Sequence, residues 1–191
     1  VARRDESTRH YDESMRLDLA RRHEMEALVE RAVASGDVTL CYQPILRLQD
    51  QITVGGEALL RLSDDQGRPV PAIDVVEAAE RMGKIGDLGE IVLRRACLDL
   101  ASWQHAAPDR PVSISVNVSA LQLDDPLLNA RVTAAMDEAG IDGSALWLEI
   151  TEGAMMRDPR RCGMVLADLR ERGIRFAVDD FGTGYSSLAY L

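Results

Sequence analysis

Oxygen-bearing side chains follow apolar runs at four places in this sequence. They are Glu57, Asn117, Glu149 and the adjacent pair Asp179-Asp180. A carboxylate at the end of a buried strand loses hydration, which costs several kcal/mol unless an opposite charge compensates it. Carboxylates that share one site also repel one another and raise each other's pKa. Divalent cations remove both penalties, and oxygen ligands without His or Cys favour Mg²⁺, Mn²⁺ or Ca²⁺ over zinc or copper.

The pair Asp179-Asp180 adds a second indication. Neighbouring side chains of an extended strand point to opposite sides. Both carboxylates can face one site only if the chain turns there, and the residues Phe181-Gly182-Thr183-Gly184 supply a turn. One carboxylate could then bridge two cations about 3.5–4 Å apart, an arrangement suited to hydrolysis of a phosphodiester.

Each of these residues also has an ordinary structural interpretation. A single Asp or Glu at a strand end is commonly a helix cap or a solvated loop residue, and an isolated Asn is commonly a turn former. Arg61, on the same predicted strand face as Glu57, can be an ion-pair partner. The spacing alone therefore leaves a metal-dependent enzyme and a set of structural residues both open.

Apolar patterns after Val38 predict the elements that position these residues. Strands are predicted at 38–45, 52–62, 112–118, 146–151 and 174–179, and helices at 72–82, 88–103, 126–138 and 158–172. This alternation predicts an α/β fold with a largely parallel sheet. A doubly wound sheet and a (β/α)8 barrel both fit the order. The barrel is favoured because no phosphate-loop glycine motif follows the first strand, and because the polar residues stand at several strand ends.

Residues 1–36 differ from the rest in their density of charges of both signs. One helical face is visible, made by Met25, Leu28, Val29, Ala32 and Val33. We expect a helical linker whose last turns dock on the domain formed by residues 37–191. A coiled-coil dimer helix is the alternative, although the pattern does not persist for three heptads.

The composition narrows the classes of function. A net charge of −10 argues against binding of a nucleic acid polymer, although cations can still mediate contact with a small phosphodiester. No apolar stretch reaches the roughly 18–20 residues that cross a bilayer, and the charged N-terminus does not read as a signal peptide, so a cytoplasmic location is expected. The cysteines Cys41, Cys97 and Cys162 are far apart and are expected to be reduced and buried.

Five segments occur in an order that matches one known family. They are Tyr42-Gln43-Pro44-Ile45, Glu57-Ala58-Leu59-Leu60-Arg61, residues 116–123, Glu149-Ile150-Thr151-Glu152 and residues 179–188, which read DDFGTGYSSL. From about Val38 to Leu191 the sequence resembles the EAL family of cyclic di-GMP phosphodiesterases. The resemblance implies a TIM-like (β/α)8 barrel and hydrolysis of cyclic di-GMP to linear pGpG by a metal-activated water.

The resemblance also implies a metal-binding role for each matching acidic residue. Glu57, Asn117, Glu149 and Asp179 would bind the first ion, and Asp179 and Asp180 would lie at the second. Glu57 and Asp180 would be the catalytic members of the set. The implied cofactors are two Mg²⁺ or Mn²⁺ ions, with Ca²⁺ as an inhibitor.

Three further residues gain roles from the resemblance. Gln43 would contact a guanine base, Arg61 would contact a phosphate, and Glu152 would hold the loop at 180–187 in its active conformation. Residues 1–36 would connect the domain to an upstream GGDEF or sensory domain, and a homodimer is also compatible with the family.

The family pattern continues past Leu191, with strands that carry a catalytic lysine, a glutamate and a glutamine. Lys84, the sole lysine, lies between two early helices and cannot replace that lysine. About five of eight strands are therefore expected here, and the isolated chain is expected to be inactive and poorly soluble because its sheet has open edges. The alternatives are a degenerate EAL module that binds cyclic di-GMP or a partner protein without cleavage, and a broken gene product without function.

Overall fold

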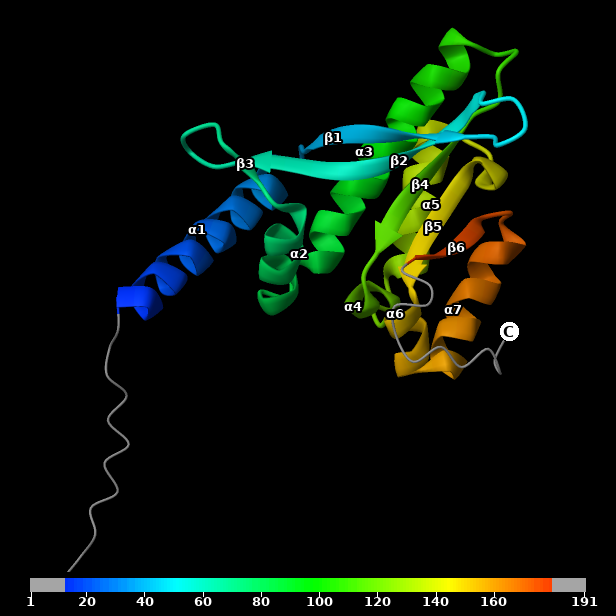
Figure 1. The fold of residues 1–191 in the computed structure, drawn as a ribbon. Coiled ribbons are helices and arrows are strands. Elements are labelled where there is room, and N and C mark those ends of the chain that lie inside the picture. The colour runs from blue at the N-terminus through cyan, green and yellow to red at the C-terminus, as the bar shows by residue number, and fades with distance from the viewer. Residues whose placement is uncertain (1–12, 180–191) are drawn as a thin grey trace, which may run out of the picture.

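The computed structural model describes residues 13–179, and its centre is one twisted sheet (Figure 1). The strand order is β1-β2-β4-β5-β6, formed by Thr39–Leu46, Thr53–Ser63, Ser113–Val118, Leu146–Thr151 and Arg175–Asp179. β1 pairs antiparallel to β2, whereas β2, β4, β5 and β6 run parallel to their neighbours. All of the predicted strands are confirmed. Within the described residues the sheet is open, with β1 and β6 as its edges.

Helices join the strands as the sequence predicts. The long ones are α1 (Glu13–Ser35), α2 (Ala72–Arg81), α3 (Ile85–Ala106), α5 (Leu128–Ala139) and α7 (Pro159–Glu171). Four short elements were not expected: β3 (Pro69–Val70), α4 (Ala120–Leu123), η1 (Gly143–Ala145) and α6 (Glu152–Arg157). They are too short to show a period in hydrophobicity, so no apolar pattern indicates them. Among the helices of residues 13–179, none has the length and apolar character that a bilayer crossing requires.

One face of the sheet is apolar and packs against helices (Figure 1). Ala58, Val116 and Leu148 stand level across β2, β4 and β5, and all three are buried. They share one core cluster with Leu100 of α3 and Val132 of α5. Since side chains alternate between faces along a strand, the residues just before and after these three point to the opposite face.

A second, smaller core forms where α1 meets α2. Met25, Val29 and Ala32 of α1 are buried in one cluster with Val75 and Ala79 of α2. The predicted helical face thus packs against the domain over its last turns. Farther toward the N-terminus the helix runs out from the body of the molecule (Figure 1).

Two expectations from the sequence need correction. Glu57 does not end its strand, because β2 continues to Ser63 and pairs with β1 along that extension. Its parallel pairing with β4 covers only Gly55–Ala58, so Glu57 lies near the end of that ladder instead. Cys97 and Cys162 are buried free thiols as expected, but Cys41 is exposed because it lies on the open face of β1.

Gly143 gives a test of this packing. A Cβ at Gly143 would lie 2.0 Å from the carbonyl oxygen of Arg172, and backbone cannot yield as a flexible side chain can. We expect Gly143→Ala to lower the free energy of unfolding by about 1–3 kcal/mol, measured by urea denaturation. Gly163→Ala is the control, since a Cβ there meets nothing within 4 Å on α7. The control should stabilise by about 0.5–1 kcal/mol because alanine favours helix. Equal stability of the two variants would contradict the packing.

Candidate metal centre

The strand register brings most of the predicted site residues to one face of the sheet. Glu57 stands opposite Ser115 of β4, and Asn117 stands opposite Glu149 of β5. Asn117 lies two residues beyond Ser115, and alternate residues share a face, so Glu57, Asn117 and Glu149 point the same way. Glu149 is in turn opposite Ala177 of β6, two residues before Asp179. The four predicted ligands of the first ion therefore share the open face, away from the apolar core.

Two hydrogen bonds hold these side chains. The Asn117 Nδ2 amide donates to Glu57 Oε1 at 2.8 Å across the β2–β4 ladder. The Ser115 hydroxyl donates to Glu149 Oε1 across the β4–β5 ladder. Asn117 uses its amide nitrogen for the first bond, so its carbonyl oxygen is the atom suited to a cation. The two hydrogen bonds thus connect side chains of three neighbouring strands, β2, β4 and β5.

The electrostatics of Glu149 fit a cation site. Burial of this half-buried carboxyl raises its pKa above the ordinary value, and the Ser115 hydrogen bond works in the opposite direction. The negative charges of Glu57 and Asp179 raise the pKa further. Glu57 and Asp179 thus lie close enough for their charges to act on Glu149. A divalent cation would offset the cost of burying a negative charge and would reduce the repulsion between the carboxylates. The residues present therefore fit an ion of the Mg²⁺ or Mn²⁺ class.

The acidic side chains of the described residues do not form a tight cluster. Within residues 13–179 no group of three or more His, Cys, Asp or Glu side chains stands in a metal-holding arrangement. The register explains part of this spacing, because Glu57 lies at the level of Ser115, Glu149 at the level of Asn117, and Asp179 at the level of Thr151. Asn117 lies among these carboxylates, and its amide oxygen would be a further metal ligand. Asp180 lies outside the described residues.

The predicted substrate-binding residues lie on the β1–β2 side of this face. Gln43 stands directly opposite Glu57 across the antiparallel ladder, and it is exposed. Arg61 lies four residues along β2 from Glu57, on the same face, and its Nη1 donates to the carbonyl of Leu60 at 2.9 Å. Glu152 begins α6 directly after the N-cap Thr151, and it is half-buried. The loop at 180–187 that it was predicted to hold lies outside the described residues.

Ser115 is the site residue that sequence reasoning passed over. The strict alternation of β4 places it with Ser113 and Asn117 on one side of the strand, but a serine in that position has no distinctive signal of its own. Only the pairing of β4 with β5 brings its hydroxyl to Glu149.

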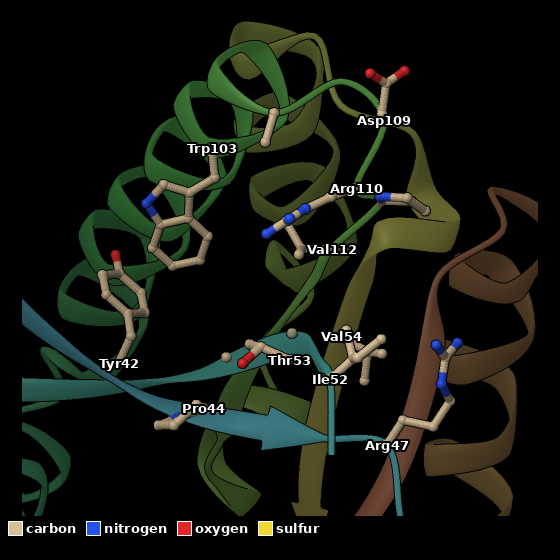
Figure 2. Close-up of a pocket in the computed structure, with 14 residues that line it drawn as sticks. Tyr42, Pro44, Arg47, Ile52, Thr53, Val54, Trp103, Asp109, Arg110 and Val112 are labelled. Atoms are coloured by element: carbon tan, nitrogen blue, oxygen red, sulfur yellow. The ribbon is translucent and has the colours of Figure 1, made fainter. Parts of the chain in front are cut away.

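A large cavity lies elsewhere and does not belong to this centre. It has a volume of about 830 Å³ and is lined by Tyr42, Thr53–Gly56, Trp103 and Arg110, among others. Figure 2 shows Tyr42 and Trp103 on one wall, Ile52 and Val54 on another, and Arg110 reaching toward Trp103. The cavity opens beside the first residues of β2 and the segment before β4, whereas Asn117 and Asp179 stand near the carboxyl ends of their strands. Tyr42 also lies on the opposite face of β1 from Gln43.

The rings in that cavity have a structural role. Tyr42 and Trp103 meet edge to face with their centroids 4.6 Å apart, and the Tyr42 hydroxyl donates to Asp99 Oδ2 at 2.5 Å. Burial and the Asp99 carboxylate both raise the pKa of Tyr42. The contact fastens β1 to α3.

Comparison with known proteins identifies the family. The EAL domain model matches residues 26–191 of this chain. An uncharacterized signalling protein of Caulobacter vibrioides is 37% identical over 183 residues, which are 96% of this chain and 22% of that protein. The oxygen sensor protein DosP of Escherichia coli is 36% identical over 165 residues, which are 86% of this chain and 20% of DosP. The chain thus spans about a fifth of the length of these relatives.

A solved structure agrees with the same assignment. The PaMucR phosphodiesterase in complex with c-di-GMP superposes with a TM-score of 0.79 at 34% sequence identity. The match covers 90% of this chain and 67% of that one. The expected fold, a TIM-like α/β barrel seen here as part of its sheet with an N-terminal helix, is confirmed by this likeness. The chain belongs to the EAL domain family.

Proposed function

We propose that the protein carrying this chain hydrolyses cyclic di-GMP to linear pGpG with the help of divalent cations. The observation that carries the proposal is the shared face of Glu57, Asn117, Glu149 and Asp179, with Glu57 and Asn117 in direct contact. The phosphodiesterase with which the chain superposes was solved with the same dinucleotide. This acidic face belongs to a chain of net charge −10, so cations must neutralise it before it can bind a negatively charged phosphodiester.

The side chains present would supply the metal ligands. Glu57, Glu149 and Asp179 would offer carboxylate oxygens and Asn117 its amide carbonyl, and Asp180 would complete the set. EAL domains generally depend on divalent metal, and this oxygen-only set suits Mg²⁺ or Mn²⁺. When bound, such ions neutralise charge on the phosphodiester and make water a stronger nucleophile at neutral pH.

Gln43 and Arg61 would orient the substrate from the β1–β2 side. Gln43 stands opposite Glu57, so a base held by its amide would lie next to the acidic face. Arg61 is exposed on the same face and carries the planar guanidinium that binds phosphate oxygens in pairs. Glu152 begins α6 directly after β5, and from there it would hold the loop at 180–187 in its active conformation.

Replacing a ligand tests the acidic face. We expect Glu149→Gln in the full-length protein to lower kcat for cyclic di-GMP by at least about 100-fold, because even residues that merely support metal ligands commonly cost 10–100-fold. Glu77→Gln on the exposed face of α2 is the control and should keep kcat within about twofold. Chromatographic assay of pGpG measures both. Full activity of Glu149→Gln would contradict the proposal.

Metal exchange tests the cation class. Removal of divalent ions with EDTA should abolish hydrolysis, and added Mg²⁺ or Mn²⁺ should restore it, since the donor set holds oxygen alone. Ca²⁺ should bind without restoring turnover and should inhibit the Mg²⁺ enzyme. Turnover that persists after exhaustive chelation would refute the role of cations. Tight binding of cyclic di-GMP with no hydrolysis in any of these ions would favour a binding module instead.

A substitution at Arg61 separates binding from chemistry. Arg61→Ala should raise KM for cyclic di-GMP by about 10-fold or more with a smaller change in kcat, because the lost contact is to a phosphate that is bound throughout the reaction. Arg81→Ala on α2 removes an exposed guanidinium whose ion pair with Glu77 is long, at 3.7 Å, and should leave KM unchanged. Steady-state kinetics decide the matter, and an unchanged KM in Arg61→Ala would rule out this role.

A further inference from the structure

Ser115 is one of two buried polar residues among those described, and it lies on the same face of the sheet as Glu57, Asn117 and Glu149. Its exposure is 2%, and the other such residue, Gln122, accepts a hydrogen bond from the backbone N–H of Ser119, the N-cap of the short helix α4. A buried hydroxyl needs a hydrogen-bond partner, and backbone carbonyls are the usual one. Ser115 instead donates to the carboxylate Oε1 of Glu149 on the neighbouring strand. The choice of partner points to a role in the metal centre.

The strand register shows what this bond does to Glu149. Ser115 stands level with Trp147, two residues before Glu149 on the same face, so its hydroxyl reaches Glu149 diagonally across the ladder. The bond occupies one carboxylate oxygen and restrains the rotation of the side chain, leaving Oε2 as the other oxygen of the carboxylate.

Ser113 provides an internal comparison. It lies two residues earlier on the same strand and face, and its hydroxyl donates to the backbone carbonyl of Val54 at 3.3 Å. Ser113 is half-buried and thus has an ordinary structural bond on the same face of the same strand. The two serines differ in their partner, since only the Ser115 hydroxyl is bonded to a predicted metal ligand.

We infer that Ser115 is a positioning residue of the metal centre, which holds the Glu149 carboxylate in the orientation that a divalent cation requires. The inference rests on the proposed function only through the assignment of Glu149 as a ligand. Hydrogen-bond donors behind a ligand commonly change metal affinity by about 10–100-fold, because they fix its orientation before the ion arrives. Ser115 acts through Glu149 and does not contact substrate or ion.

The test measures Mn²⁺ binding in the absence of substrate. Isothermal titration calorimetry on the metal-free full-length protein should show that Ser115→Ala weakens Mn²⁺ binding about 10–100-fold. Ser113→Ala should stay within about threefold of the wild type. Ser115→Thr, which keeps the hydroxyl, should recover most of the affinity. The Tm of the metal-free protein should be similar for Ser115→Ala and Ser113→Ala, which separates positioning from general stability.

Several outcomes would overturn the inference. An unchanged Mn²⁺ affinity in Ser115→Ala would do so, as would an equal loss in Ser113→Ala.

If Ser115→Ala does not fold, Ser115→Cys replaces it, because a thiol has a similar shape but donates weakly. Ser115→Cys should then also weaken Mn²⁺ binding. A wild type that binds Mn²⁺ but does not cleave cyclic di-GMP would end the proposed function and leave this inference standing. A wild type that binds no Mn²⁺ would end both.

Discussion

Parallel pairing of β2, β4, β5 and β6 determines which side chains can act together in this protein. One row across the pleat carries Ala58, Val116 and Leu148, which are buried and hold the sheet to its helices. The rows before and after it face the other way: Glu57 stands level with Ser115 in one, and Asn117 stands level with Glu149 in the other. A register shift of one residue in β2 or β5 would turn Glu57 or Glu149 into the core. The apolar face therefore fixes the position of the acidic face.

The neighbouring negative charges disfavour the ionised form of Glu149, and a bound cation would remove that penalty. Glu149 is half-buried, and both Glu57 and Asp179 act on its pKa in the same direction as burial. The hydrogen bond from Ser115 acts on the Glu149 pKa in the opposite direction and offsets only part of that cost. An ion that binds several of these oxygens would couple three strands at once. Stability, metal binding and activity should consequently depend on the same few residues.

Much of this could be predicted from the sequence, for identifiable reasons. The strands and long helices have clear periods, and the candidate ligands are oxygen-bearing residues that follow apolar runs. Short elements such as α4 carry no period, so no pattern in the sequence predicts them. Ser115 was passed over because a serine becomes distinctive only when the strand beside it presents a carboxylate. The exposure of Cys41 follows from the open face of β1, which apolar composition does not reveal.

The most direct measurement of the central claim is the position of a bound ion. Crystals of the full-length protein soaked in Mn²⁺ would give an anomalous diffraction signal wherever the ion lies. We expect that signal on the polar face of the sheet, within coordination distance (roughly 2.0–2.3 Å) of oxygens from Glu57, Asn117 and Glu149. A manganese signal confined to other surfaces, with these three side chains uncoordinated, would contradict the account.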